Sequence, residues 1–420
     1  MIKNKFINIY LIFSLILFAN CSDNKTDSGA NEETIKIAHI DPQTGPFALQ
    51  GASGTSHMRY IIEQINADGG VLGGRKLEIV ALDNKTNPQE SLVNLEQAIG
   101  EGIQYITQGN GSHVGRALTE AIKKHNARNI GAEVVFLNNA AVDPALTNES
   151  CHFWHFRFDA HVGMKANALT SSIANEPSIK KLYLINQDYS YGHAVAKEAE
   201  NFIKVKRPDI EIVGNEFHPV GRVKDFAPYV AKIKDSNADA VLSGNWGSDL
   251  ALLIKSAAES GLDSLMYTNY GNLVGTVRTI GASGVGRVRV ASSFHQNIDG
   301  YPLEDLNVGY KKQSGEDWVH NPYKYLIEMW AMAMNKAGSS NPKAVALALE
   351  NLSYDGGVGK VTMRKDDHQL MLPLYVSSFS ELGGQVKYDS ENTGFGWKTN
   401  FVLSAEETEL PHTCEMDNRP

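Results

Sequence analysis

The chain has 420 residues, 42% of them hydrophobic and 21% charged, which is an ordinary globular balance over a length that suits two or three domains. Its formal net charge is −9 at pH 7, and its pI is about 5.8. Because no run of lysine and arginine interrupts this mild acidity, nucleic acid is not expected as a partner.

The first residues form a segment unlike the rest of the chain. Lys3 and Lys5 supply a basic start, and an apolar run follows at positions 6–18. This run is shorter than the roughly 20 residues that cross a bilayer as a stable helix. Residues 1–21 are therefore predicted to be a secretory signal, which takes no part in the fold.

Cys21 ends this segment, and its position resembles the lipidation site of bacterial lipoproteins. Phe18 and Asn20 depart from the usual residues at such a site, so plain cleavage that leaves a free thiol is the alternative. Residues 22–33 contain no large apolar side chain and are expected to be a flexible tether.

Two further cysteines, Cys151 and Cys414, are expected to reach an oxidising compartment, where an even number favours pairing. A bridge between them ties the C-terminal tail to the middle of the chain. The sequence does not give the distance between the two residues, so the disulfide is a prediction.

From residue 34 onward, short β-rich runs alternate with amphipathic helical stretches. In the first of these stretches Met58, Ile61, Ile62 and Ile65 share one helix face. Strands are predicted at 34–40, 76–82, 104–107, 182–185, 210–213, 240–243 and 288–290. Further helices are predicted at 89–99, from 194, from Asp225 as the N-cap, and at 248–261, 303–313, 322–337 and 342–351.

This alternation predicts an α/β fold with two Rossmann-like lobes, whose parallel sheets are flanked by helices. The first lobe is expected over 34–156 plus about 287–365, and the second over 157–286 plus about 366–420, with several crossings as the hinge. Ligands of open α/β sheets bind beyond the carboxyl ends of the strands. Two facing lobes therefore place those loops around one cleft.

No enzyme motif is complete. Residues 281–285 lack the last glycine of a nucleophile elbow, and 109–112 have no following lysine for a phosphate-binding loop. Cys151, His152 and His155 do not have a standard zinc spacing, and we interpret them as packing beside a disulfide. His368 has no nucleophile nearby and is interpreted as a hydrogen-bonded structural histidine. We predict a protein that is not an enzyme and has neither a metal nor a cofactor.

Loops at predicted strand ends carry glycine, amide and aromatic residues. They lie at 45–51, 108–112, 137–144, 188–192, 244–247 and 267–272. The small residues at 109–112 expose backbone N–H groups where a helix starts, which suits a carboxylate or another anion. Glycine and asparagine also make ordinary tight turns, so one such loop decides nothing. Six of them together predict a polar ligand cleft with aromatic walls.

The chain resembles the periplasmic solute-binding proteins of branched-chain amino acid ABC importers, the Leu/Ile/Val-binding family with the type I periplasmic fold. The similarity covers nearly all of 34–380, and it rests on the order and spacing of several stretches rather than on any single one. These are GPFALQG, INADGGVLGGRKLEIVALDNKTNP, NNAAVDPALT, FWHFRFDA, INQDYSYG, VKDFAPYVAKIKDSNADAV and GNWG. MRKDDHQLMLPLYV and the terminal cysteine resemble a subgroup whose substrates are less uniform.

The resemblance implies ligand contacts at particular positions. Backbone and small polar groups that hold a ligand carboxylate are expected at Gly111, Ser112, Ala140, Ala141 and Val142. Other residues that line or flank the cleft are expected at Gln50, Asp188, Tyr191, Trp246, Asn269 and Tyr270.

One of these positions departs from the family pattern. Amino-acid binders place a carboxylate against the ligand ammonium where this chain has Tyr270. A buried ammonium without a charge partner is costly. Either Asp188 or Asp143 substitutes for the missing carboxylate, or the ligand carries no ammonium. We favour the second and hypothesise that the ligand is an amide or an aromatic or aliphatic carboxylate.

The resemblance implies the solute-binding component of an ABC importer, a monomer that closes on a small polar molecule and delivers it to a permease in the inner membrane. It is expected in the periplasm, held to a membrane by the lipid on Cys21. The alternative is a ligand-sensing binding protein with a separate signalling partner. A third hypothesis, a secreted hydrolase, rests on no motif.

Overall fold

The computed structural model describes residues 34–416 and residue 419. The predicted signal, the lipidation site at Cys21 and the tether lie outside these described residues. Among the described residues, no helix has the length and hydrophobicity to span a bilayer.

The first sheet has five strands. They are β1 (Ile35–Asp41), β2 (Leu77–Asp83), β3 (Tyr105–Gln108), β4 (Val135–Asn138) and β5 (His155–Arg157). Their order is β2-β1-β3-β4-β5, and all neighbours run parallel. Every residue of β3 and β4 is buried, as expected for central strands of a parallel sheet with both faces covered.

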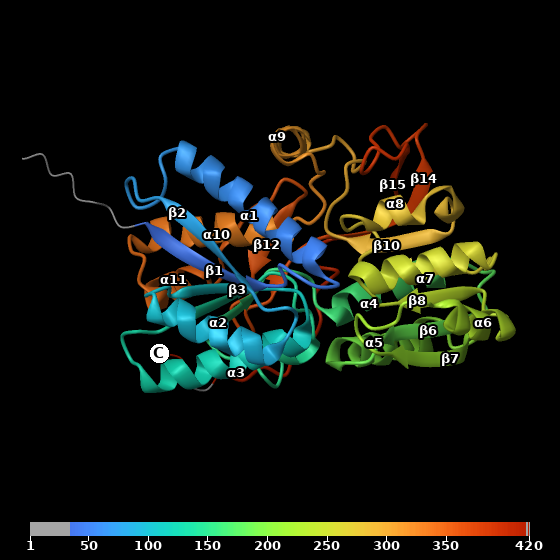
Figure 1. The fold of residues 1–420 in the computed structure, drawn as a ribbon, viewed down its shortest axis with the longest axis horizontal. Coiled ribbons are helices and arrows are strands. Elements are labelled where there is room, and N and C mark those ends of the chain that lie inside the picture. The colour runs from blue at the N-terminus through green and yellow to red at the C-terminus, as the bar shows by residue number, and fades with distance from the viewer. Residues whose placement is uncertain (1–33, 417–418, 420) are drawn as a thin grey trace, which may run out of the picture. The chain divides into compact units, whose positions relative to one another are not determined.

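Helices cover both faces of this sheet. They are α1 (Ala48–Ala67), α2 (Pro88–Gly100), α3 (Ser112–Arg128), α10 (Pro322–Ala337) and α11 (Pro342–Leu349). α2 and α3 pack together on one face, whereas α1 packs against α10, and α10 against α11, on the other (Figure 1). The chain therefore returns to the first sheet late in its course. We call this sheet and these helices the first lobe.

The second sheet has seven strands. They are β6 (Lys181–Gln187), β7 (Glu211–His218), β8 (Ala240–Ser243), β9 (Leu265–Thr268), β10 (Val288–Ser292), β14 (Leu374–Glu381) and β15 (Phe395–Leu403). Their order is β15-β14-β10-β9-β8-β6-β7. The strands from β10 to β7 are parallel, and β14 and β15 extend the sheet as an antiparallel edge.

The helices of the second sheet are again divided between its faces. They are α4 (Val162–Ala174), α5 (Ser190–Lys206), α6 (Ala227–Asp235), α7 (Gly247–Glu259) and α8 (Thr276–Ile280). α4 and α5 pack together, and α7 packs against α6 and α8 (Figure 1). α6 begins two residues after Asp225, whose side chain accepts the N–H of Ala227 at 2.8 Å, so the predicted N-cap is one position early. We call this sheet and these helices the second lobe.

One sequence-based assignment is wrong. The strand at 288–290 was expected to join the first lobe, but β10 pairs with β9 and β14 in the second sheet. The connection from β9 to β10 is short and contains only α8 and the 3-10 turn η2 (Ala282–Gly284). Short connections favour pairing between consecutive strands, whereas β-propensity alone does not specify a partner. The chain leaves for the first lobe only after β10, through α9 (Glu304–Ser314), which contacts α1.

A small third sheet lies where the chain crosses back. It consists of β11 (Ser353–Asp355), β12 (Lys360–Met363) and β13 (Leu370–Met371), which pair in antiparallel fashion. A single parallel bridge joins Gln369 to Arg157 at the end of β5. The segment between the first lobe and β14 is therefore fixed to the edge of the first sheet.

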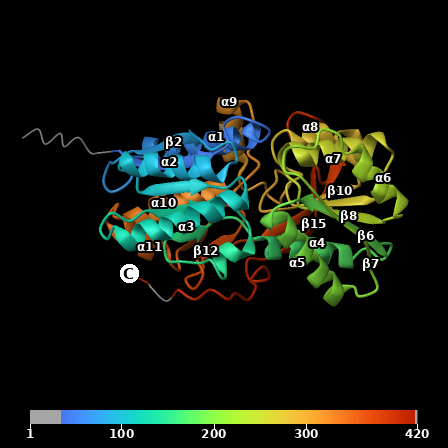
Figure 2. The same ribbon diagram turned by 60° about the horizontal axis from the view of Figure 1, so that its bottom comes forward.

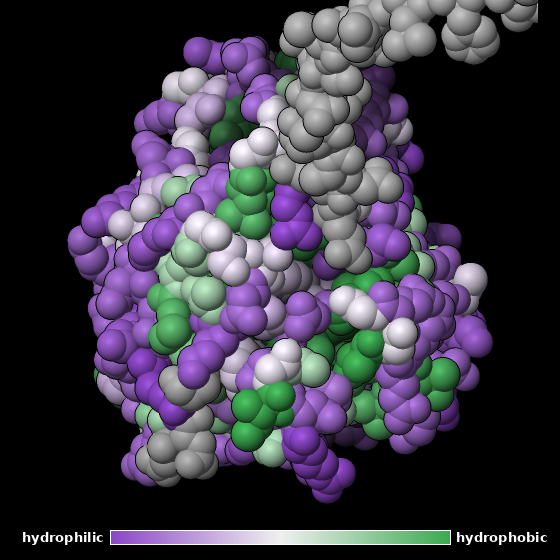
Figure 3. Space-filling view, turned by 90° about the vertical axis from the view of Figure 1, so that its left-hand side faces the viewer, coloured by the Kyte–Doolittle hydropathy of each residue, from purple (hydrophilic) through white to green (hydrophobic). Residues whose placement is uncertain are grey.

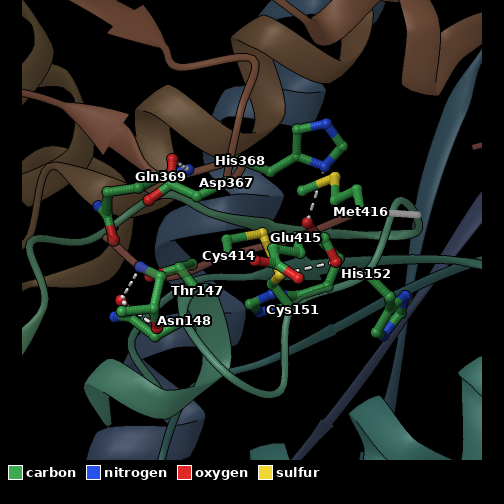
Figure 4. Close-up of a disulfide and its surroundings, with 12 residues drawn as sticks. Thr147, Asn148, Cys151, His152, Asp367, His368, Gln369, Cys414, Glu415 and Met416 are labelled. Carbon is green, nitrogen blue, oxygen red and sulfur yellow. Dashed lines mark hydrogen bonds between the residues drawn. A yellow bond between two sulfur atoms is a disulfide. The ribbon is translucent and has the colours of Figure 1, made fainter. Parts of the chain in front are cut away.

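The predicted disulfide between Cys151 and Cys414 is confirmed (Figure 4). The C-terminal tail follows β15 of the second lobe and runs along the underside of the molecule in Figure 2. Near the bridge, Asn148 Oδ1 accepts the backbone N–H of Thr413 at 2.8 Å. The tail is thus a covalent connection between the end of the second sheet and the first lobe.

His368 lies close to this disulfide and has a structural role (Figure 4). Its ring is buried, stacks on Phe156 at 3.9 Å, and interacts with the carbonyl of His155 and with Glu350 at 3.1 and 3.2 Å. The interpretation as a hydrogen-bonded structural histidine is confirmed. Across residues 34–416, no group of three or more His, Cys, Asp or Glu side chains is arranged to hold a metal ion.

The face of the first lobe in Figure 3 is mostly hydrophilic, with separate hydrophobic patches. The large hydrophobic residues exposed on the described chain are scattered over many elements. They are Leu49, Val93, Ile130, Val205, Val308, Leu347, Leu382 and Val402. Isolated exposed apolar side chains are ordinary on a soluble surface.

Candidate functional site

A pocket lies between the strand-end loops of the two large sheets, with about 560 Å³ of space when the open solvent at its mouth is included. Each of the six loops singled out in the sequence contributes at least one lining residue. The lining residues are Gln50, Ser53, Gly109, Asn110, Gly111, Ser112, Ala140, Val142, Tyr189, Tyr191, Trp246, Tyr270, Leu273, Val274, Val319, His320 and Tyr323. The loops converge there because parallel strands point their carboxyl ends to one edge of each sheet.

The part of the first-lobe wall that follows β3 and β4 is built from backbone and small side chains. Gly109 has no room for a side chain, because a Cβ atom there would lie 1.8 Å from Asn139 Oδ1. Gly111 has a φ of 95°, which suits glycine, and it precedes α3 directly. The first N–H groups of α3 have no intrahelical acceptor, and the helix dipole makes this end attractive to an anion. The wall is therefore suited to a carboxylate.

Asn110 is held in place by a buried carboxylate of β1. Its backbone N–H and side-chain amide donate to Asp41 at 3.0 and 2.8 Å. Asp41 also interacts with the buried ring of His39 at 3.0 Å. Both oxygens of Asp41 are thus engaged below the loop, so this carboxylate positions the wall rather than facing the pocket.

The loop after β4 is closed by its own asparagine. Asn138 Oδ1 accepts the N–H groups of Ala140 and Ala141 at 3.2 and 2.7 Å. This turn places Ala140 and Val142 in the pocket lining. Ala141 is fully buried behind the turn and packs against Gly115, where a Cβ atom would meet the Ala141 side chain. The loop continues into the 3-10 turn η1 (Pro144–Thr147).

The second-lobe wall is built from aromatic side chains. The hydroxyl of Tyr191 donates to the carbonyl of Gly244 at 2.7 Å and accepts from the side chain of Asn269 at 3.1 Å. The indole N–H of Trp246 donates to the hydroxyl of Tyr189 at 2.9 Å. Burial raises the pKa of Tyr189 and Tyr191 well above the ordinary value, so both hydroxyls stay protonated.

Aromatic contacts join the two lobes at the pocket rim. Phe47, from the loop after β1, lies 4.1 Å from Trp246 between ring centroids. His113 of α3 lies 5.2 Å from Tyr189 in an edge-on arrangement. A Cβ on Gly247 would approach Phe47 to 2.8 Å, so this glycine permits the close approach. The rim therefore depends on side chains from both sheets.

Tyr270 has buried charged residues behind it. Its hydroxyl lies 3.5 Å from Asp159 Oδ2, and the same oxygen pairs with Lys165 at 2.8 Å. Gln369 supports this region, because its side chain donates to the carbonyl of Asp159 at 2.8 Å and accepts from Arg157 at 2.6 Å. The buried Arg157 also donates to the carbonyl of Asp143 at 2.6 Å. The motif around Gln369 thus braces the end of β5.

Several lining residues were missed by the sequence analysis. Ser53 and Tyr323 come from helices α1 and α10, and Val319 and His320 come from the loop before α10. His320 is 8% exposed, and its Nε2 has no hydrogen-bond partner. The one local signal in this region is Pro322 at the first position of α10, which marks the end of the loop that carries Val319 and His320.

Three of the predicted site residues do not line the pocket. Ala141 lies behind its loop, and Asn269 is buried, where it supports Tyr191. The Asp188 side chain is 59% exposed and pairs with His193 at 2.9 Å. The other predicted residues reach the lining, namely Gln50, Gly111, Ser112, Ala140, Val142, Tyr191, Trp246 and Tyr270. Their part in ligand binding stays a prediction.

The alternative carboxylate, Asp143, is also absent from the lining. Its side chain caps η1 through the N–H of Ala145 at 3.0 Å and lies 3.4 Å from Arg116. Within residues 34–416, the pocket lining contains no aspartate, glutamate, lysine or arginine. The walls therefore combine uncharged polar groups with aromatic rings.

Two lobes of this topology, with one pocket at their strand ends, match a known family over most of the chain. The profile of the periplasmic binding protein family matches residues 34–384. The chain belongs to the periplasmic binding protein family. It is 33% identical over 398 residues to Leu/Ile/Val-binding protein homolog 4 of Brucella abortus (strain 2308), which covers 93% of this chain and 94% of that protein.

Solved structures of periplasmic binding proteins agree with this assignment. The leucine-, isoleucine-, valine-, threonine-, and alanine-binding protein from Brucella ovis, in a closed conformation, superposes with a TM-score of 0.83 at 31% identity, covering 92% of this chain and 100% of that chain. A solute-binding protein of an ABC transporter from R. palustris, in complex with benzoate, has a TM-score of 0.76 at 14% identity, covering 91% and 100%, and shows the fold alone.

These matches confirm both the family resemblance and the two-lobed type I fold predicted from the sequence. Members of this family are solute-binding proteins of transporters, and membership places the chain in the periplasm. Among the sequence-based hypotheses, the solute-binding protein of an ABC import system is the one that these findings support.

Proposed function

We propose that this periplasmic binding protein captures a small polar solute between its lobes and delivers it to an ABC permease in the inner membrane. The observation that carries this proposal is the convergence of six strand-end loops, three from each large sheet, on one pocket. Ligand binding beyond the carboxyl ends of the strands is typical of open α/β sheets.

The ligand class follows from the two walls. The backbone of the first-lobe wall at Gly111 and Ser112 suits a carboxylate, and the aromatic second-lobe wall suits an apolar or planar body. Relatives are named for branched-chain amino acids, and structures of more distant proteins hold benzoate or hydroxybenzoates. We infer an amino acid, an amide or a small carboxylate as the solute.

Capture is proposed to occur by closure of the lobes. The contact between Phe47 and Trp246 joins the two strand-end edges across the rim of the pocket, which supports a closed state. A solute that bridges both walls shifts the equilibrium towards this state by its differential affinity, and the permease then recognises the closed form. The lobe boundaries near residues 156 and 365 are part of this proposal, together with a crossing to the first lobe that follows β10.

The protein is proposed to work as a monomer on a lipid anchor. Cys21 and the following tether, which precede the first described strand, have the composition that such an anchor needs. An anchored binding protein has a raised effective concentration at its permease. Mass spectrometry of membrane extracts tests this, and an unmodified Cys21 thiol on the mature protein contradicts it.

A thermal-shift screen tests the main proposal. Amino acids, amides, urea, and aliphatic and aromatic carboxylates are added singly to the mature protein, and the unfolding midpoint is followed. A ligand that binds only the folded state adds about 2.7 kcal/mol of stability at a hundredfold excess over Kd. We expect one class to raise the midpoint by several degrees. No shift with any small solute, together with saturable turnover of an amide or ester, would revive the hydrolase hypothesis.

A further inference from the structure

A buried ion pair lies directly behind the second-lobe side of the pocket. Lys165 Nζ, on the first turn of α4, lies 2.8 Å from Asp159 Oδ2, and the two side chains are 3% and 2% exposed. The other oxygen of Asp159 accepts the N–H of Ala160 at 2.8 Å. A buried pair of charges is retained only when each charge neutralises the other at close range, because both have lost their water.

This pair contacts two lining residues of the pocket. The Tyr270 hydroxyl lies 3.5 Å from Asp159 Oδ2, and Lys165 Nζ lies 4.2 Å from the centre of the Tyr270 ring. His320 Nε2 lies 4.0 Å from the same carboxylate oxygen. Tyr270 and His320 both line the pocket. Asp159 is therefore the buried carboxylate next to this wall, and its charge is already matched by Lys165.

We propose that Lys165 determines the specificity of the pocket, because its ammonium occupies Asp159 in place of a ligand ammonium and so excludes α-amino acids. This inference rests on the proposed solute-binding function. A ligand ammonium that entered here would lose its water and meet a neutral pair instead of a free carboxylate. The pocket lining within residues 34–416 contains no carboxylate of its own.

His320 indicates what the ligand carries instead. Burial lowers its pKa to about 4, so the ring is neutral at pH 7. Nε2 of this ring has no hydrogen-bond partner within the described chain, although it lies 4.0 Å from Asp159 Oδ2. A neutral imidazole has one N–H donor and one acceptor nitrogen. In this proposal Nε2 is the acceptor, and it takes a hydrogen bond from a ligand hydroxyl or amide.

The walls together describe one class of solute. A carboxylate lies against the start of α3, an apolar or aromatic body fills the space between the tyrosines and Trp246, and a hydroxyl donates to His320. The structure thus assigns the pocket to small hydroxy-carboxylic acids. An unmet polar group in a dry site gives selectivity, because a ligand without the donor leaves that group unpaired.

Matched ligands test this assignment by calorimetry. L-Leucine and (S)-2-hydroxy-4-methylpentanoate differ only in an ammonium and a hydroxyl, and 4-methylpentanoate lacks both. L-Phenylalanine, phenyllactate and 4-hydroxybenzoate extend the comparison to aromatic bodies. We expect at least one hydroxy acid to bind at least tenfold more tightly than its amino acid. Preferential binding of the amino acids overturns the inference but leaves the proposed function intact, whereas failure of every solute overturns the proposed function.

Substitution of the lysine tests the role of the ion pair. Lys165→Met frees Asp159 and is expected to raise the affinity for the amino acid relative to the hydroxy acid at least tenfold. Lys204→Met, the same change at a 71% exposed lysine, is the matched control and leaves the ratio unchanged. An unchanged ratio in a folded Lys165→Met protein overturns the assignment to Lys165, because a purely structural pair alters stability without altering selectivity.

A second variant covers the case in which Lys165→Met does not fold. Asp159→Asn with Lys165→Met removes both charges together and leaves no buried unpaired ion. This double variant is expected to keep binding the hydroxy acid and to gain no affinity for the amino acid, because no carboxylate becomes free. Tight binding of leucine by the double variant contradicts the inference, since the ion pair would then have no part in excluding the ammonium.

Discussion

The two walls of the pocket differ in the chemistry of their groups. The first-lobe wall consists of backbone around Gly109 and Gly111, held from below by Asp41 and Asn138. The second-lobe wall consists of aromatic side chains, which hydrogen-bond one another and the strand-end backbone. Backbone groups recognise a feature shared by many ligands, such as a carboxylate. Side chains, in contrast, can be changed by substitution, so they can adapt the pocket to one ligand. We infer that the backbone loops of the first lobe supply general affinity, whereas the side chains around them, among them Tyr270 and His320, supply selectivity.

The disulfide that ties the end of the second lobe to the first lobe gives the largest expected effect on the free energy of unfolding. Cys151→Ser with Cys414→Ser removes a bridge between residues that are 263 positions apart. Removal of a native disulfide from an exported domain costs about 2 to 5 kcal/mol, and loops of this length lie at the upper end in chain-entropy treatments. Urea denaturation of the oxidised protein and the variant measures the loss. Equal free energies of unfolding would show that the tail adds nothing to the connection between the lobes.

The first-lobe wall is broken by Gly109→Ala. The added Cβ lies 1.8 Å from Asn139 Oδ1, so the loop has to move. We expect the protein to lose about 1 to 3 kcal/mol of stability and most of its affinity for the ligand found in the thermal-shift screen. Gly100→Ala at the end of α2 is the matched control, because a Cβ there meets nothing within 4 Å. Undiminished affinity in Gly109→Ala contradicts a backbone cradle.

The second-lobe wall is weakened by Trp246→Ala. This change removes the ring that contacts Phe47 across the rim and the donor to Tyr189. We expect Kd to rise about 10- to 100-fold, as for a buried aromatic anchor, with a smaller change in the stability of the ligand-free protein. Trp246→Phe keeps a ring at the rim and is expected to lose less affinity. Calorimetric titration that finds the same Kd in all three proteins would remove Trp246 from the site.

Buried histidines give a smaller effect, which depends on pH. His57 is buried on α1 of the first lobe, and burial lowers its pKa to about 3, against 6.5 in the unfolded chain. The unfolded state therefore binds a proton that the folded state rejects, and stability falls as pH decreases from about 6.5 towards 3. Each such group contributes a slope of about 1.4 kcal/mol per pH unit.

His57→Gln sharpens this point. Below about pH 6.5, the free energy of unfolding of the variant is expected to depend on pH less steeply than that of the wild-type protein, by about 1.4 kcal/mol per pH unit. This difference does not depend on the absolute stability of the variant. Urea denaturation at pH 6, 5 and 4 measures the slope in the variant and in the wild-type protein. An unchanged slope in His57→Gln would mean that this ring is protonated without cost in the folded state.

Local patterns predicted the elements well. The stripe formed by Met58, Ile61 and Ile62 lies buried on α1, and the helices expected at 303–313 and 322–337 are α9 and α10 within a few residues. Periodicity records which face of a segment loses contact with water, and this depends on neighbours along the chain. The six loops were found for the same reason, because each follows a strand whose end is visible in the sequence.

Long-range partners were not predicted by these patterns. β10 was assigned to the wrong sheet, and Asp188 was placed in a pocket that it does not reach. His320 enters the site from a loop before α10 that carries no strand-end signal. The pairing of Lys165 with Asp159 had no signal either, because a lysine on a helix is ordinarily exposed.

The sequence by itself determined the class of fold, the family, the loops that face the cleft and the disulfide partners. Each of these depends on local patterns, on the order of such patterns along the chain, or on the count of cysteines. Only the tertiary structure decided which charges neutralise each other and which polar atoms are left without a partner. Those properties depend on distances between segments that are remote in the chain, and electrostatic energy in a dry pocket changes steeply with such distances.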